Sequence, residues 1–100
     1  FQDKLYLDQE LTIFKLSKLM DSNTNYLSTL INSTYQLNFA NFINKQRVAY
    51  ARQALLEQSN QQLTIESIGS ASGFKSKSSF NAAFKKFTGK TPSEFMKNPN

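Results

Sequence analysis

Five lysines fall between positions 75 and 90, and no acidic residue interrupts them. They are Lys75, Lys77, Lys85, Lys86 and Lys90. Such a concentration of ammonium groups attracts polyanions, either nucleic acid or an anionic membrane surface. The alternative is a solvated lysine face without a ligand. Charge alone favours neither interpretation, so other residues must decide between them.

A second group of side chains has the chemistry to hydrogen-bond base edges. If the apolar residues of segment 24–34 face a core, the outward residues are Asn25, Ser28, Thr29 and Asn32. By the same reasoning, the outward residues of segment 77–87 are Lys77, Ser78, Asn81, Ala82 and Lys85. Asn can pair bidentately with adenine, and Ser or Thr can bond most base edges or phosphates. The alternative for each set is a solvated polar face.

The groups that enzymes use are scarce. The chain has no Cys and no His, which removes disulfides, thiolate nucleophiles, imidazole acid–base catalysis and the usual zinc ligands other than carboxylates. Only seven acidic residues are spread over the chain, too few to favour a carboxylate metal or hydrolase site. We therefore expect no enzyme activity, no cofactor and no metal.

Length and composition predict a single folded domain. The chain has 100 residues, 39% of them hydrophobic and 13% aromatic, with a formal net charge of +5. No apolar stretch approaches the roughly 18 residues of a membrane span, and no signal peptide is visible. We expect a soluble cytoplasmic domain without membrane contact. Because the sequence begins at Phe1 without an initiator Met, we expect it to be a fragment of a longer protein.

Helical spacing and capping residues predict an all-α fold, beginning with a helix pair over about 11–35. A short helix begins after Thr12. Its expected core residues are Ile13, Leu16, Leu19 and Met20. A second helix begins after Asn23 or Thr24. Its expected core residues are Tyr26, Leu27, Leu30 and Ile31.

A longer helix is predicted over about 39–58, where neither Gly nor Pro interrupts the chain. A second helix pair follows over about 63–88, with Thr64 and Ser76 as caps and Gly89 as the terminator. The run Thr91-Pro92-Ser93-Glu94 has the form of a capping box and begins a final helix over about 92–97. With the acidic start of the chain as a further element, we expect about seven helices.

The two helix pairs are related by an internal repeat. Leu11-Thr12-Ile13 recurs as Leu63-Thr64-Ile65 at an offset of 52, and the second helices match at an offset of 53. Each half therefore reads as a helix-turn-helix unit, whose second helix can enter a major groove. The helix between them would span about 30 Å, close to the ~34 Å of one turn of B-DNA. The alternative is a helical bundle with a duplicated hairpin.

The second half also carries a recognisable signature. From Gly73 to Phe95 the chain reads GFKSKSSFNAAFKKFTGKTPSEF, which resembles the AraC/XylS family of bacterial transcription regulators. The family pattern there is G-F, then S, F, F-K and G-x-T-P-x-x-[YF]. The resemblance covers about residues 11–97 and includes Asn25-Tyr26-Leu27 and Arg47 in the first half.

This resemblance implies a DNA-binding domain with two helix-turn-helix units, and a sensor or dimerisation domain on its N-terminal side. The residues expected to contact bases are Asn25, Ser28, Thr29, Asn32, Lys77, Ser78 and Asn81, and positions 77, 78, 81 and 82 are where the family reads bases. The residues expected to contact phosphates, mostly at helix N-termini, are Asn23, Thr24, Lys75, Ser76 and Lys85. Double-stranded DNA is the expected partner, with RNA polymerase as a further one.

Several positions depart from the family pattern. Asp21 stands where the first turn usually has Gly, whereas Gly73 keeps that residue in the second. Gly69 replaces a small Ala in a helix, and Ser72 occupies a commonly apolar position. Because Gly within a helix costs roughly 0.5–1 kcal/mol relative to Ala, these changes predict a loosely held second unit. We expect Arg47, which matches a family Arg on the long helix, to be structural and to bridge helices.

Sequence-specific binding of double-stranded DNA is thus the leading hypothesis. Base contacts would discriminate between sequences, and lysines would supply the salt-dependent affinity. The main alternative is a protein-interaction module that contacts RNA polymerase or a partner domain. A third possibility is a helix bundle that binds an anionic membrane surface.

Overall fold

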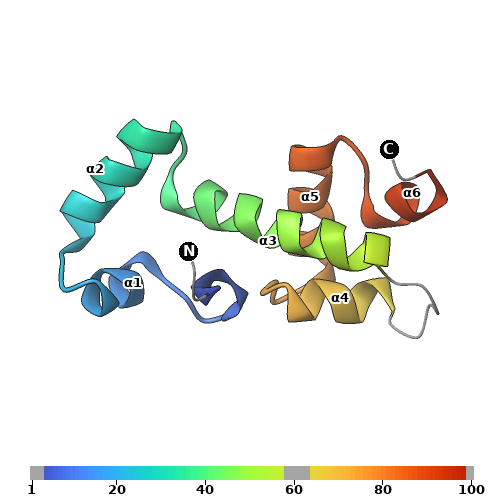
Figure 1. Cartoon of the computed structure of the whole chain (residues 1–100), viewed down its shortest axis with the longest axis horizontal. Helices are drawn as coiled ribbons and strands as arrows, with labels where there is room; N and C mark the ends of the chain where they lie inside the picture. The colour runs from blue at the N-terminus through green and yellow to red at the C-terminus, as the bar shows by residue number, and fades with distance from the viewer. Residues whose placement is uncertain (1–3, 58–63, 99–100) are drawn as a thin grey trace.

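The computed structural model describes residues 4–57 and 64–98, and within those ranges every regular element is helical. The elements are η1 (Leu5–Leu7, a 3-10 turn), α1 (Ile13–Leu19), α2 (Thr24–Tyr35), α3 (Phe39–Glu57), α4 (Ile65–Ala71), α5 (Lys77–Thr88) and α6 (Pro92–Lys97) (Figure 1). The predicted all-α fold is therefore confirmed. The expected end of the long helix at 58 and start of the second unit at 63 lie outside the described residues.

Side-chain caps begin the helices at the predicted positions. Thr12 Oγ1 accepts a hydrogen bond from the amide of Lys15 at 3.1 Å, and Thr64 Oγ1 accepts one from the amide of Ser67 at 2.9 Å. These equivalent caps open the first helix of each unit. Of the two candidates for the cap of α2, the structure selects Asn23.

The final helix begins with the reciprocal bonds of a capping box. The amide of Thr91 donates to Glu94 Oε1 at 2.9 Å, and the amide of Glu94 donates back to Thr91 Oγ1 at 3.2 Å. The first bond lowers the pKa of the Glu94 carboxyl most, because it stabilises the charged form. The positive charges of Lys85 and Lys90 lower it further.

Helix α3 is shared by two separate hydrophobic cores. The first-unit core comprises Leu16, Leu27, Ile31, Phe42 and Ile43. The second-unit core comprises Val48, Ala51, Leu55, Ile68, Phe74, Phe80, Ala83, Phe84 and Phe95. The N-terminal half of α3 thus serves one unit and the C-terminal half serves the other. Figure 1 accordingly shows α1 and α2 at one end of the molecule and α4, α5 and α6 at the other.

Helices α4 and α5 of the second unit are in close contact at Gly69, against the expectation that this unit is loosely held. A Cβ atom at Gly69 would collide with the ring of Phe80, so the glycine allows α5 to lie against α4. The hydroxyl of fully buried Ser72 donates to the carbonyl of Ile68 at 2.6 Å. Both departures from the family pattern therefore have a packing role that their helix propensities do not reveal.

In the first unit, four residues expected in the core are exposed instead. The exposed fractions are 66% for Leu19, 55% for Met20, 62% for Tyr26 and 42% for Leu30. The expectation was wrong for Tyr26 and Leu30 because α2 buries only a narrow stripe, Leu27 and Ile31. It was wrong for Leu19 and Met20 because α1 buries only Leu16 and Ser17, so its C-terminal end faces solvent.

Candidate nucleic-acid interface

Helix α2 presents nearly its whole surface to solvent. Only Leu27 and Ile31 are buried and only Thr24 is half-buried. The four residues expected to contact bases are all exposed: Asn25, Ser28, Thr29 and Asn32. Since residues three and four apart share a helix face, these four side chains form one polar stripe opposite the buried pair. The structure therefore brings together the four side chains of the first unit that are predicted to contact bases.

Helix α5 is more deeply embedded than α2. Phe80, Ala83 and Phe84 are buried on its inner face. On its outer side Lys77 and Ser78 are exposed, and Asn81 is half-buried. These three side chains belong to the first turns of the helix, whose N-terminal residues are the ones that reach base edges in helix-turn-helix proteins.

The beginnings of α2 and α5 are built alike. Asn23 Oδ1 accepts from the amide of Tyr26 at 2.9 Å, and Ser76 Oγ accepts from the amide of Ser79 at 3.1 Å. Each cap satisfies the third amide of its helix and leaves the preceding two without an intrahelical acceptor. Free amides at a helix start favour an anion, which suits the predicted phosphate contacts.

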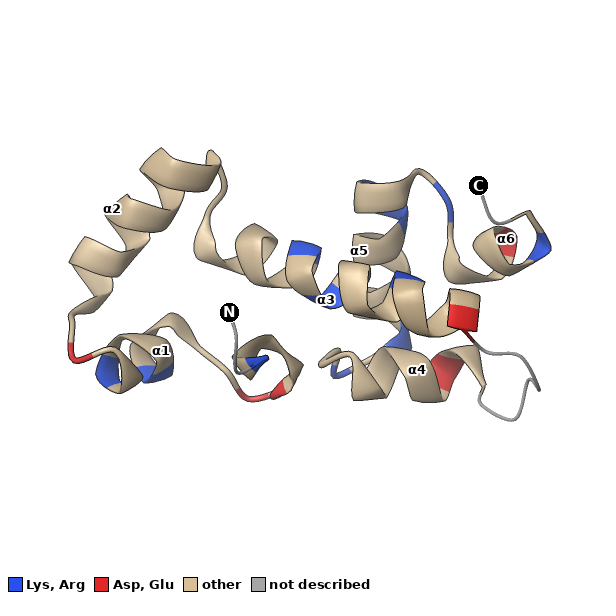
Figure 2. Ribbon diagram, viewed as in Figure 1, with Lys and Arg blue, Asp and Glu red and all other residues tan. Residues whose placement is uncertain are grey.

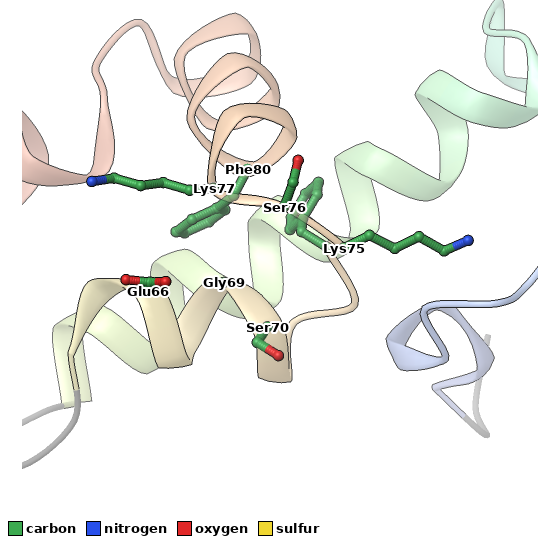
Figure 3. A pocket seen from close by; sticks show the side chains of 8 residues that line it. Glu66, Gly69, Ser70, Lys75, Ser76, Lys77 and Phe80 are labelled. Atoms are coloured by element: carbon green, nitrogen blue, oxygen red, sulfur yellow. The ribbon is translucent and has the colours of Figure 1, made fainter.

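Two lysines that flank Ser76 point in opposite directions (Figure 3). Lys75 extends toward the N-terminal segment, where its Nζ lies 3.2 Å from a carboxylate oxygen of Glu10. Lys77 extends the other way, from the start of α5 and away from the N-terminal segment. Both side chains of the Lys75–Glu10 pair are well exposed. An ion pair of this kind stabilises a protein by about 0–1 kcal/mol, and salt screens it. Lys77 is therefore better placed than Lys75 to contact DNA together with the other residues predicted to contact bases.

Two further lysines of the second unit, Lys86 and Lys90, form hydrogen bonds with nearby residues. Lys86 Nζ donates to Asn41 Oδ1 on α3 at 2.9 Å, and Lys90 Nζ donates to the carbonyl of Asn98 at 2.6 Å. Lys85 is exposed near Glu94. Figure 2 shows these cations at the end of the molecule that carries α5, whereas α2 has none.

Arg47 has the bridging role that the sequence predicts, and its partners are backbone carbonyls of the N-terminal segment. Its Nε donates to the carbonyl of Tyr6 at 2.5 Å, and its Nη2 donates to the carbonyl of Asp8 at 2.9 Å. Partial burial lowers the pKa of this guanidinium, and the charge of Asp8 opposes that effect. The contact ties α3 to residues that precede the first helix-turn-helix unit.

Gln9 is a positioning residue that the sequence did not reveal. Its Nε2 donates to the carbonyls of Ser70 at 3.2 Å and Phe74 at 3.1 Å, on either side of the turn between α4 and α5. The N-terminal segment therefore braces the second unit although it precedes the first. No local sequence pattern signals a bond between residues that are more than 60 positions apart.

A small cavity of about 180 Å³ opens between α4 and the start of α5 (Figure 3). Glu66, Gly69 and Ser70 line one side, and Ser76, Lys77 and Phe80 line the other. It is smaller than the roughly 300–1,000 Å³ of small-molecule sites. Within residues 4–57 and 64–98, no three His, Cys, Asp or Glu residues come together as metal ligands. The outer faces of α2 and α5 are therefore the better candidate site.

The arrangement of two capped helix pairs on one long helix has a counterpart in a known family. A family model described as a helix-turn-helix domain matches residues 16–98. The chain belongs to the AraC-type helix-turn-helix family. This AraC-type domain also contains, in its described part, no helix that is long and apolar enough to span a membrane.

Curated relatives of the AraC-type domain are regulators by name. It is 31% identical over 90 residues to the melibiose operon regulatory protein of Escherichia coli, covering 90% of this chain and 29% of that protein. It is 28% identical over 92 residues to an uncharacterised HTH-type transcriptional regulator of Staphylococcus aureus, covering 92% of this chain and 12% of that protein. The chain thus spans less than a third of the length of either relative.

Solved structures share the fold over nearly the whole AraC-type domain. The C-terminal domain of AraT, a response regulator from Geobacillus stearothermophilus, aligns with a TM-score of 0.82 and 26% identity, over 94% of this chain and 75% of that one. The C-terminal domain of the response regulator YesN from Fusobacterium nucleatum aligns with a TM-score of 0.79 and 26% identity, over 94% of this chain and 88% of that one.

Proposed function

We propose that this domain binds double-stranded DNA sequence-specifically, with α2 and α5 in successive major grooves. The observation that carries the proposal is that α3 holds two helix-turn-helix units at its opposite halves. With 19 residues it is about 28 Å long at 1.5 Å per residue, and the molecule extends 42 Å along its longest axis. Those lengths suit two helices about one 34 Å turn of B-DNA apart.

The roles of the side chains follow from their donors and acceptors. In the second unit, Lys77 is suited to guanine and Asn81 to adenine, because each can face the matching groups in the major groove. In the first unit, Asn25 and Asn32 are suited to adenine. Ser28, Thr29 and Ser78 complete the proposed base contacts.

Phosphate contacts would set the orientation of the domain on the duplex. We assign them to the two helix starts, through Asn23 and Thr24 at α2 and through Ser76 at α5, together with the exposed Lys85. Lys75 can contribute only if phosphate replaces Glu10 as its partner. None of these contacts requires an enzyme activity or a cofactor.

The same proposal extends to the protein that carries the domain. The curated relatives are much longer than this chain and are named as regulators, and the similar solved structures are C-terminal domains of response regulators. These names support a cytoplasmic transcription regulator with a sensor or dimerisation domain on the N-terminal side of this domain. RNA polymerase would then be a second partner of the DNA-bound protein.

One observation favours the alternative function, a protein-interaction module. Helix α1 and the residue after it expose Phe14, Leu19 and Met20, at 58%, 66% and 55%. Such residues suit a contact with RNA polymerase or a partner domain. Binding of that kind would survive substitution of Lys77 and Asn81 and would change little with salt.

Selection from duplexes with about 30 random base pairs, nearly three helical turns, tests the proposed function. At physiological salt we expect two enriched patches whose centres lie one helical turn apart. Lys77→Ala and Asn81→Ala should relax one patch only, whereas the matched surface change Lys97→Ala should leave both intact. Retention without enrichment would reduce the domain to a non-specific polyanion binder and favour the alternative.

A further inference from the structure

We propose that α2 recognises thymine methyl groups, so that the half-site of the first unit is rich in A·T pairs and is held mainly by uncharged contacts. This inference rests on the proposed function and adds the kind of sequence that the first unit reads. In this division of roles, the second unit supplies most of the salt-dependent attraction to phosphate.

The first observation is the absence of charge around α2. No acidic or basic residue occurs from Ser22 to Asn44, a range that includes the whole helix and its flanking turns. Figure 2 shows α2 without a charged residue, in contrast to α5. Because Lys and Arg supply the ion-release part of DNA affinity, α2 itself contributes little of that part.

The second observation is an apolar stripe beside the polar one. Tyr26 and Leu30 are 62% and 42% exposed and lie one helical turn apart. Thr29 and Ser33 lie on the same face by their spacing, and the methyl group of Thr29 adds to its apolar surface. In the major groove, the apolar group that a base pair offers is the C5 methyl of thymine. Exposed apolar atoms next to Asn25 and Thr29 therefore match A·T pairs.

The repeat provides an internal comparison, because α5 lacks this stripe. At the offset of 53, Ser79 corresponds to Tyr26 and Ala83 corresponds to Leu30. The hydroxyl of Ser79 donates to the carbonyl of Ser76 at 3.0 Å, and Ala83 is buried. Ser79 is exposed but polar, and Ala83 belongs to the core, so these two positions form an exposed apolar pair only in α2. The proposed thymine preference belongs to the first unit alone.

The polar residues beside the apolar stripe favour DNA over a protein as the occupant of this surface. Thr29 and Ser33 border Tyr26 and Leu30, and Asn25 and Asn32 lie beyond Thr29 on the exposed side of α2. Their amide and hydroxyl groups pair with base edges. The exposed apolar residues Phe14, Leu19 and Met20 of the first unit lie on α1 and just after it.

Replacing deoxythymidine with deoxyuridine removes only the C5 methyl group and so tests the inference directly. The duplex is the one enriched by selection, and the half-sites are assigned by the patch that Lys77→Ala relaxes, which belongs to the second unit. We expect about a fourfold loss of affinity for each contacted methyl removed from the first half-site. The same change in the second half-site should have little effect.

Two variants connect the methyl group to the protein. Tyr26→Ala and Leu30→Ala should lower the affinity for the thymine duplex and abolish its advantage over the uracil duplex. The matched control is Leu56→Ala, since Leu56 is 47% exposed on α3 and lies in the other half of the chain. Thermal unfolding of each variant separates a lost contact from a lost fold.

The outcomes separate this inference from the function on which it rests. If a duplex is selected but uracil binds as well as thymine in the first half-site, the inference is wrong and the proposed function stands. Folded Tyr26→Ala and Leu30→Ala proteins with unchanged DNA affinity would also overturn it and would indicate a protein-docking face. If no duplex is enriched at all, both proposals fail.

Discussion

Asp21 and Gly73 occupy the same place in the two turns, and both have a left-handed backbone. Their φ angles are 54° and 103°. The internal repeat therefore extends to the conformation of the turn, although only the second turn has the glycine that suits it. Asp is among the few other residues that visit this region, at some cost.

Asp21→Gly should therefore stabilise the domain by about 0.5–1 kcal/mol, because relief of left-handed strain outweighs the extra entropy of glycine in the unfolded chain. Urea denaturation measures the change. Gly73→Ala should have the opposite effect, since its Cβ would lie 2.5 Å from the carbonyl oxygen of Tyr6 and 2.6 Å from Nε of Arg47. An Asp21→Gly protein that is less stable than the parent would contradict this account of the first turn.

Gly69→Ala should destabilise the domain by about 1–3 kcal/mol, although alanine favours a helix more than glycine does. The reason is the collision of the new methyl group with the ring of Phe80. Glu66→Ala, at an exposed position of the same helix, is the control and should change the free energy of unfolding little. Equal or greater stability of Gly69→Ala would show that α4 and α5 have room to separate.

Arg47→Met should destabilise the domain by about 1–3 kcal/mol, because the half-buried carbonyl of Tyr6 and the exposed carbonyl of Asp8 lose the guanidinium as donor. The same substitution at Arg52, which is exposed on α3 and lies 5.5 Å from the ring of Phe95, should cost less. Chemical denaturation of both variants gives the comparison. If both variants lost the same free energy of unfolding, Arg47 would act by packing alone.

The lowered pKa of Glu94 predicts a loss of stability in acid. A carboxyl whose pKa is lower in the folded than in the unfolded state adds stability above its unfolded pKa and loses it as the pH falls through the folded value. The parent protein should therefore lose more stability than Glu94→Gln between neutral pH and the range below the ordinary glutamate pKa. Thermal unfolding across that range tests this, and parallel curves would exclude a role for the charge of Glu94.

DNA binding should weaken steeply with salt. Six neutralised phosphates would give a slope near −5 in log K against log salt, from about 0.9 per phosphate. Lys85→Ala should make the slope shallower by about one phosphate, whereas Asn25→Ala should lower the affinity and leave the slope unchanged. A slope near zero for the parent protein would rule out this mode of binding.

Much of the helical framework could be read from short stretches of sequence. Thr12, Asn23, Thr64, Ser76 and Thr91 cap helices as predicted, because a cap is a hydrogen bond between residues only three positions apart. The repeat and the signature from Gly73 to Phe95 then indicated two helix-turn-helix units. The exposed polar stripe on α2 followed from the same helical period.

The tertiary structure decided which apolar residues are core and which are surface. Tyr26 and Leu30 have the spacing of core residues, yet α2 is covered only over Leu27 and Ile31. Likewise, the bonds from Gln9 to the turn between α4 and α5 join residues that are far apart in the chain. Helical period and capping are local properties that one segment of sequence specifies by itself. Burial and long-range hydrogen bonds depend on which surfaces meet once all the helices have packed.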